Sequence, residues 1–494
     1  MKAFLISSLL LAAATASARE PAVAGQFYPA DPAALARAVD AYLVASGAKV
    51  PSGVVAVLAP HAGYEYSGKL AGLAYREIAG AYDTVVILAT GHTEGVKGAA
   101  LLVSDSYKTP LGTIQPDRAL GAALLKASPL FEDRPSAHLR EHAVEVQLPF
   151  LQRRLKKPFK LLPAVLNTQD PAALKTIASM LASALKGKKA LLVISTDFSH
   201  YPSHADAAAS DGAMLLAIES MDPELFLSAS KFIGQKTIMV PENIPGLDTC
   251  ACGEAAVAVG MEAARLLGAR SFRVLKISDS YVENPAMGPE RVVGYISGVF
   301  STAGKPAGLA LTLSKAQRAA LLKEARRTLE RHFAGEAQPA GLEAEPRLTL
   351  PGAAFVTLTL GGALRGCVGT VEPALTLADA VRYGAYSAAL RDGRFAPLVK
   401  EELEKVKIEV SVLSPLKPAA HAALKPGLHG AVVAKDGRSG LFLPQVWEQL
   451  PAKEDFLGEL CAQKAGLPRD CWKDPAVKLY SFTVDAFAEG ETLK

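Results

Sequence analysis

The chain has 494 residues and a formal net charge of +4 at pH 7, from 53 Lys and Arg against 49 Asp and Glu. This length is too great for one ordinary hydrophobic core and suggests roughly two to four domains. Half of the residues are apolar and 21% are charged, which is typical of a soluble globular protein and excludes collagen-like, coiled-coil and disordered chains. The near-neutral charge gives no electrostatic case for nucleic-acid binding, and five Cys are too few for a disulfide scaffold.

The first eighteen residues have the three features of a secretory signal peptide. Lys2 gives a positive start, residues 3–14 are apolar except for two serines, and residues 16–18 (Ala-Ser-Ala) form a small-x-small cleavage motif. We expect cleavage to leave a mature chain that begins near Arg19; the alternative is a retained N-terminal helix. The apolar run is too short to span a bilayer, and no other stretch reaches that length. The expected location is therefore periplasmic or secreted, without stable membrane insertion.

Strand-like and helix-like patterns alternate from residue 54 to about 300. Helical patterns, such as those at 171–187 and 252–268, lie among short, continuous apolar runs. Such runs fit strands that are buried on both faces of a parallel sheet. The runs are at 54–59, 84–89 and 190–195. This alternation predicts an α/β domain over residues 19–300.

The second half of the chain has a different pattern. A small, turn-rich segment predicts a linker at 301–307, and a strong amphipathic helix pattern follows at 313–333 with Ser314 as its N-cap. Strand patterns then occur at 354–360, 406–413 and 431–443, and the last contains an Asp-Gly hairpin turn. We predict a smaller α+β domain over residues 308–494.

Each of the three apolar runs is followed by a histidine. These are His61, His92 and His200. In an open α/β sheet, the loops beyond the carboxyl ends of the strands line the ligand crevice. A single His is more often a satisfied core or surface side chain, but three at equivalent positions favour a functional cluster, because imidazole is the commonest metal ligand and the usual general base. Asp197, three residues before His200, could orient an imidazole or cap the following turn.

Two cysteines and a Glu-His pair are further candidates. Cys250 and Cys252 lie just before a helical pattern, where the helix dipole favours thiolate, the metal-binding form. The alternative is a buried or disulfide-linked pair. Glu141 and His142 lie at the predicted start of another helix, where the Glu could cap the helix and the His could line the same pocket.

Six stretches of the first half together resemble the Memo family. In chain order they are REPAVAGQFYP (19–29), APHAGYEYSG (59–68), GHTEG (91–95), EHAVEVQLPFLQ (141–152), STDFSHY (195–201) and CGEAAV (252–257). The resemblance implies a fold like that of the class III extradiol dioxygenases. It also implies a copper or iron site that supports redox chemistry. In this sequence the implied metal ligands are His61, His92 and Cys252, with Asp197 and His200 beside them as catalytic residues.

One ligand departs from the dioxygenase pattern. Dioxygenases of the related fold hold Fe(II) with two His and one carboxylate. Here Cys252 takes the third place, and a thiolate is softer and shifts the preference towards copper(I) or zinc. This substitution counts against ring-opening dioxygenase chemistry. Ligation of Cys252 would leave Cys250 as the reactive thiol of the pair.

The second half resembles the AMMECR family from about residue 308 to 490. The matching stretches are LRGCVGT (364–370), SAALRDGRFAPL (387–398) and LFLPQVW (441–447). The two families occur with a radical SAM protein in the AmmeMemoRadiSam system, which implies a functional link to such a protein. Arg365 and Cys367 form a possible second site, since a nearby cation favours thiolate; the alternative is a small buried residue at a tight turn. Cys461 and Cys471 could pair in an oxidising compartment.

Three functions fit these observations. We favour a metal-dependent oxidoreductase in which His200 moves protons, acting on an unknown small-molecule or peptide substrate. The alternatives are a metal-handling protein without turnover and a module whose cleft binds a peptide or partner. His200 discriminates between the first two, because turnover needs a base close to the open coordination position and storage does not. The basic run at 152–160 is interpreted as a solvated helix end and not as a nucleic-acid site.

Overall fold

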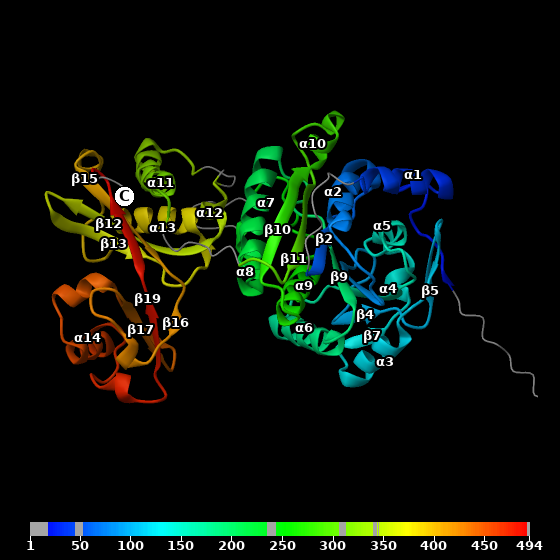
Figure 1. Ribbon diagram of the computed structural model, residues 1–494. Coiled ribbons are helices and arrows are strands. Elements are labelled where there is room, and N and C mark those ends of the chain that lie inside the picture. The colour runs from blue at the N-terminus through cyan, green and yellow to red at the C-terminus, as the bar shows by residue number, and fades with distance from the viewer. Residues whose placement is uncertain are drawn as a thin grey trace, which may run out of the picture. The chain divides into compact units, whose positions relative to one another are not determined.

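The computed structural model describes residues 18–44, 53–234, 244–305, 313–338, 343 and 345–491 (Figure 1). Residues 1–17 of the predicted signal peptide and the end of the predicted linker, at 306–307, lie outside the described residues. Two compact units are present. The first contains Met1–Asp197, Cys252–Ile277 and Tyr295–Lys305, and the second contains Phe198–Ala251, Ser278–Gly294 and Pro306–Lys494. The second unit therefore takes residues from both sides of the predicted linker.

An eight-stranded sheet, in the order β10-β11-β2-β9-β3-β8-β4-β7, organises the first half of the chain. Its four central strands are mutually parallel: β2 (Val54–Ala59), β9 (Ala190–Ser195), β3 (Thr84–Thr90) and β8 (Lys160–Leu166). Every residue of β3 is buried, so the prediction of strands covered on both faces is confirmed there. The sheet as a whole is mixed, because β11 (Gly294–Ser301) is antiparallel to β2, and β4 (Ala99–Leu101) is antiparallel to β8. The edge strands are β10 (Ser271–Asp279) and β7 (Phe131–Asp133).

Helices pack on both faces of this sheet. On one face α9 (Glu254–Leu266) approaches so closely that a Cβ on Gly260 would lie 2.4 Å from Ile194. Alternate strand residues such as Val193 point to the other face, into a core shared with α2 (Tyr64–Arg76) and α5 (Leu148–Arg154). The helices around these are α1 (Pro32–Tyr42), α3 (Arg118–Ala127), α4 (Ser136–Leu139) and α6 (Pro171–Leu185). A short 3-10 turn, η1 (Glu145–Gln147), precedes α5.

The first described strand, β1 (Ala18–Arg19), forms a small three-stranded sheet with β5 (Ser106–Thr109) and β6 (Gly112–Ile114). In it, Ala18 pairs with Ser106 and Arg19 pairs with Tyr107 in parallel register. Among the helices of the described residues, none has both the length and the apolar composition needed to cross a bilayer.

The second unit begins with α7 (His204–Glu219) and α8 (Pro223–Ile233). It also contains the short helices α10 (Ser280–Glu283), η2 (Pro285–Met287) and α12 (Pro346–Thr349). Within it, α7 packs against α12, where Gly212 leaves room for the Pro346 ring. The predicted helix at 313–333 is α11 (Lys315–Ala334), and Ser314 caps it in a reciprocal capping box with Gln317, as its position predicted.

Two antiparallel sheets form the rest of this unit. The first has the order β13-β12-β15-β20, and its strands are β12 (Pro351–Leu360), β13 (Ala363–Gly369), β15 (Val406–Leu413) and β20 (Val484–Ala488). A short strand, β14 (Leu375–Thr376), pairs with β12, and α13 (Leu377–Leu390) packs on the sheet. The second sheet has the order β16-β19-β17-β18: β16 (Lys417–Pro418), β19 (Lys478–Phe482), β17 (Gly430–Lys435) and β18 (Arg438–Phe442). The predicted hairpin turn is confirmed, because Asp436 and Gly437 both have positive φ, at 50° and 76°.

Cys461 and Cys471 form a disulfide beside α14 (Lys453–Glu459), with 6.0 Å between their Cα atoms. Spacing in the sequence left this pairing open. Both sulfurs lie in a small apolar core with Phe456 and Trp447. The other three cysteines of the chain, Cys250, Cys252 and Cys367, are not part of this disulfide.

Candidate metal centre

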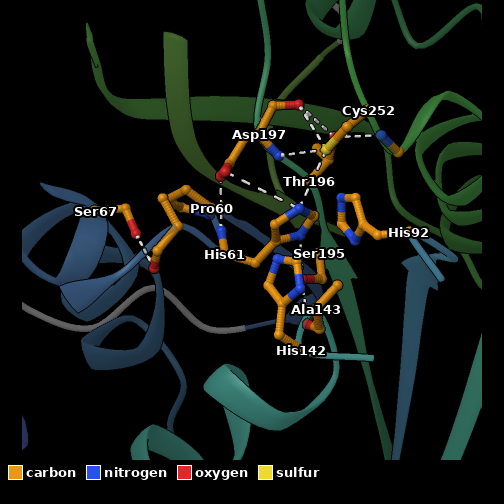
Figure 2. Close-up of polar contacts among 12 residues, drawn as sticks. Pro60, His61, Ser67, His92, His142, Ala143, Ser195, Thr196, Asp197 and Cys252 are labelled. Atoms are coloured by element: carbon orange, nitrogen blue, oxygen red, sulfur yellow. Dashed lines mark hydrogen bonds and ion pairs between the residues drawn. The ribbon is translucent and has the colours of Figure 1, made fainter. Parts of the chain in front are cut away.

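Three side chains from separate parts of the first half meet at one point (Figure 2). His61 follows β2, His92 follows β3, and Cys252 precedes α9, as the predicted strand ends required. One ligand atom of each lies within 4.8 Å of the others, and His61 Nε2 is 3.2 Å from Cys252 Sγ. His61 is buried, whereas the His92 side chain is 32% exposed, so the cluster is reached by solvent on the His92 side.

Hydrogen bonds around Ser195 fix the tautomer of His61. The Ser195 hydroxyl donates its single hydrogen to the Ala143 carbonyl at 2.7 Å. It also accepts a hydrogen bond from the Gln147 side-chain amide at 2.8 Å. Towards His61 Nδ1, 3.0 Å away, Ser195 can therefore only accept, so Nδ1 carries the ring proton. The lone pair on Nε2 then faces Cys252 Sγ, which is the arrangement a metal-ligating imidazole needs.

Glu141 orients His92 in the same way. The Glu141 carboxylate accepts from the His92 amide at 2.5 Å and lies 2.9 Å from His92 Nδ1. It also accepts from the Ala143 amide at 2.9 Å. The bonds from His92 and Ala143 hold the pKa of this buried carboxyl down at about 2, although burial alone would raise it. Because a carboxylate can only accept, Nδ1 of His92 carries a proton, and in the neutral ring Nε2 is the nitrogen that holds the lone pair.

Cys252 is held by the chain around Asp197. The Cys252 amide donates to the Asp197 carbonyl at 3.2 Å, and the Asp197 amide donates to Cys252 Sγ at 3.4 Å. Gly253 is required beside it, since a Cβ there would lie 2.8 Å from the Thr196 side chain. Thr196 Oγ1 in turn accepts from the Gly253 amide at 3.0 Å.

The expectation that the helix dipole lowers the pKa of Cys252 is wrong for the metal-free protein. Burial raises this pKa well above its usual range, and the Asp197 carboxylate raises it further. The partial charge of a helix N-terminus, about half an elementary charge, is smaller than these two effects. A cation at the cluster would supply the missing positive charge, since coordination deprotonates a thiol outright.

Asp197 binds the backbone of His61 and not its ring proton. Its Oδ1 accepts from the His61 amide at 2.7 Å, and its Oδ2 is 4.0 Å from His61 Nε2. This backbone contact is neither of the two roles that the sequence left open for Asp197, which were orienting an imidazole and capping the following turn. Its part in catalysis stays a prediction.

His200 follows Asp197 by three residues in the sequence. Its Nδ1 is 2.7 Å from the Phe198 carbonyl, so Nδ1 donates and Nε2 is not used in this hydrogen bond. Its backbone pairs with Val293 and bonds Thr249. His200 is not a member of either ligand group found among the described residues, and its proton-carrying role stays a prediction.

His142 joins the cluster as a third imidazole. Its ring stacks on His92 with centroids 4.4 Å apart and meets the edge of His61 at 5.4 Å. Burial and the neighbouring imidazoles lower the pKa of His142 to about 3, so its ring is neutral. The sequence indicated that His142 could lie near the same site, and the structure places its ring beside His61 and His92. The sequence gave no sign of the ring stacking, because residues 92 and 142 lie fifty positions apart and meet only through the fold.

Residues 19–299 match the family model described as Memo-like protein, and residues 322–487 match the AMMECR1 model. The chain belongs to the Memo family. It is 37% identical over 263 residues to a MEMO1 family protein of Aquifex aeolicus, covering 53% of this chain and 92% of that protein. A MEMO1 family protein of Methanothermobacter thermautotrophicus is 33% identical over 273 residues, covering 53% of this chain and 93% of that protein. Among solved structures, an uncharacterized protein, PH0010, from Pyrococcus horikoshii is 35% identical, with a TM-score of 0.34 over 36% of this chain and 94% of that chain.

The chain is thus a fusion of a Memo domain and an AMMECR1 domain, as the resemblance implied. The matched Memo region contains all of the clustered residues: His61, His92, Glu141, His142 and Cys252.

Outside the Memo region, the candidate pair Arg365 and Cys367 has no comparable arrangement. The Arg365 guanidinium bonds the Glu402 carboxylate, at 2.8 and 3.1 Å, so it is not directed at the thiol. Cys367 Sγ accepts from the Thr357 hydroxyl at 3.4 Å, and the Cys367 amide donates to Asp392 at 2.9 Å. Among the described residues, neither ligand group includes Cys367.

Cys250 does not have the exposure expected of a reactive thiol. It is 4% exposed, and its Sγ donates to the Ser230 carbonyl at 3.7 Å. Its neighbour Cys252 is the more accessible of the two. The sequence could not distinguish them, because both precede the same helix.

Proposed function

We propose that this Memo-family protein binds one transition-metal ion through His61, His92 and Cys252. We further propose that it uses the ion for redox or oxygen chemistry on a small-molecule or peptide substrate. The observation that carries the proposal is the pair of fixed tautomers. Ser195 and Glu141 accept hydrogen bonds from Nδ1 of His61 and His92, respectively. The Nε2 atoms of both rings and the sulfur of Cys252 are therefore the atoms available together to a metal ion.

The donor set fits a metal that accepts both nitrogen and sulfur ligands. Two imidazoles and a thiolate suit copper, zinc or iron, and the thiolate favours copper(I) or zinc among these. Bound copper or iron would supply one-electron chemistry, which zinc would not. Three protein ligands leave a coordination position for substrate, as catalytic sites do. The 32% exposure of the His92 side chain supports access from that side.

Around the ion, the protein's own groups would hold ligands and move protons. Glu141 and Ser195 accept hydrogen bonds from Nδ1 of His92 and His61 and so orient the two rings. We retain His200 as the proton carrier of this proposal, because its Nδ1 proton is used on Phe198 and its Nε2 can accept a proton. The mixed sheet with ligands at its strand ends supports a class III dioxygenase-like fold for the Memo domain.

We also propose that the protein acts outside the cytoplasm. The signal-peptide pattern of residues 1–18 supports this location. The Cys461–Cys471 disulfide supports it independently, since disulfides persist mainly in oxidising compartments.

A functional link to a radical SAM protein is proposed from the pairing of Memo and AMMECR1 domains.

Elemental analysis of the full chain purified from its native compartment tests the proposal, followed by oxygen-uptake assays with and without the metal found. We expect one equivalent of copper or iron and metal-dependent uptake that His200→Ala abolishes while most of the metal stays bound. His421→Ala, in the second half, is the matched control and should change neither. Metal-free native protein would contradict the metal site. Bound metal without any redox activity would instead favour a metal-handling protein.

A further inference from the structure

Arg19 is a buried cation far from the metal centre in sequence but connected to it in space. It is 4% exposed, at the first strand of the described chain. Its three guanidinium nitrogens reach three different residues of the segment 138–145, which runs from α4 to η1 and which we call the 138–145 loop. Nε donates to the His138 carbonyl at 3.0 Å, one terminal nitrogen donates to the Glu141 carbonyl at 2.6 Å, and the other pairs with the Glu145 carboxylate.

Glu145 receives the rest of the N-terminal segment. This fully buried carboxylate accepts from the Ala22 amide at 2.8 Å, the Val23 amide at 3.1 Å and the Tyr28 hydroxyl. Residues 19–28, which we call the N-terminal strap, are therefore fastened to a carboxylate only three residues from His142. Because all four of these donors come from the strap, Glu145 would lose them in the interior without it.

The loop that the strap holds also carries Glu141 and His142, which lie beside the metal centre. Glu141, whose backbone Arg19 binds, orients His92 through its carboxylate. The strap also contacts His142 directly, since the Phe27 ring lies 4.8 Å from the His142 ring. A shift of the loop would move the carboxylate that sets the tautomer of His92.

We propose that Arg19 is a positioning residue for the metal centre, and that the N-terminal strap fixes the loop on which Glu141 and His142 are presented. This inference rests on the proposed function. Lysine cannot replace arginine in this role, because one ammonium cannot span two carbonyls and a carboxylate that a planar guanidinium reaches together. Lysine does preserve the charge opposite Glu145, so Arg19→Lys separates positioning from charge compensation.

The experiment compares full chains carrying Arg19→Lys with Arg382→Lys as a matched control. Arg382 is also buried, at 3% exposure, and pairs with Glu324, Glu343 and Asp379 in the second unit. Cobalt(II) is the metal probe, because its absorption reports ligand geometry. A second readout needs no metal: nitrogen-15 labelling of the nine histidines shows the tautomer and amide exchange of His92 in the metal-free protein.

For Arg19→Lys we expect cobalt binding weakened by roughly tenfold to hundredfold, the range for loss of an outer partner of a ligand. We also expect faster amide exchange at His92 and a mixture of His92 tautomers at temperatures where the protein is fully folded. Arg382→Lys should change none of these. Unchanged binding and an unchanged His92 signal in folded Arg19→Lys would overturn the inference.

The two proposals fail separately. Wild-type protein that binds no cobalt would refute the metal site, while the His92 signal would still decide whether the strap positions the loop. If Arg19→Lys does not fold, Tyr28→Phe removes a single donor to Glu145 and leaves the charge pair intact. It should change the His92 exchange rate in the same direction by a smaller factor, and no change there would overturn the inference.

Discussion

Two free thiols of this chain, Cys252 and Cys367, have similar sequence surroundings and different structural ones. Each lies beside glycine, and each is partly accessible. Cys252 Sγ is 3.2 Å from an imidazole nitrogen whose proton is held elsewhere, whereas Cys367 Sγ contacts the Thr357 hydroxyl. The comparison shows that a thiol becomes a metal ligand through the side chains that distant segments bring to it, and not through its neighbours in sequence.

The charged side chains near Cys252 and near Cys367 also differ. Burial raises the pKa of Cys252 and the Asp197 carboxylate raises it further, so the metal-free thiol resists ionisation, while the charge of the same carboxylate favours a cation at the cluster. Near Cys367, Arg394 donates to the Cys367 carbonyl and pairs with Asp392, which compensates charge without any metal. We therefore expect metal to be confined to the Memo domain.

The largest expected effect comes from removing both imidazole ligands. The double variant His61→Ala, His92→Ala should lose all stoichiometric copper or iron, because a lone thiol cannot replace two nitrogen donors. Metal content per chain, measured after equilibrium dialysis, checks this. If the double variant retained one equivalent, the metal would be bound at another place, for example in the AMMECR1 domain. That result would contradict the difference drawn between Cys252 and Cys367.

The next effect separates the two thiols. Cys252→Ser should weaken copper(I) binding by more than the roughly hundredfold that an outer partner contributes, since it removes a ligand. Cys367→Ser should leave the affinity unchanged. Competition with a copper(I) chelator measures both. Equal losses in the two variants would show that the thiols are not distinguished as described.

A smaller effect is expected from the carboxylate that orients His92. Glu141→Gln should weaken metal binding by roughly tenfold to hundredfold, because the amide is a poorer acceptor for the His92 Nδ1 proton. Glu402→Gln is the matched control, since Glu402 orients Arg365 near Cys367. The same chelator competition applies. A Glu141 variant that binds the metal as tightly as wild type would show that Glu141 does not support the metal site.

The smallest effect concerns the stability of the region around Cys367. Arg394 and the Cys367 amide hold the pKa of Asp392 well below its usual value, so the stabilisation is present above about pH 4 and is lost as the pH falls through the folded-state pKa. Asp392→Asn should therefore lower the unfolding temperature at pH 7 and have less effect below pH 3. Equal losses at both pH values would contradict this, and added metal should alter neither result.

Several elements followed from the sequence because one physical signal dominated each of them. Continuous apolar runs predicted β2, β3 and β9, and the Ser314 cap predicted the start of α11. The three-residue strand β4 is too short to give any pattern, and the apolar residues of β11 do not report its direction, so the mixed character of the sheet was not predicted.

For the site, the sequence predicted the two histidines and the cysteine but not the network that orients them. His61, His92 and Cys252 lie at strand or helix ends, which sequence patterns locate. The roles of Ser195, Glu145 and Arg19 depend on contacts between residues more than fifty positions apart, and no local pattern reports such contacts. The pKa of Cys252 was predicted in the wrong direction because burial cannot be read from a helix start.

X-ray absorption spectroscopy at the copper edge tests the central claim most directly. Spectra would be recorded for three proteins, each loaded with one equivalent of copper(I): the wild-type chain, Cys252→Ser and Cys367→Ser. The account predicts two nitrogen scatterers and one sulfur scatterer in wild type and in Cys367→Ser, and no sulfur in Cys252→Ser. A wild-type spectrum without sulfur, or a sulfur scatterer that survives in Cys252→Ser, would contradict it.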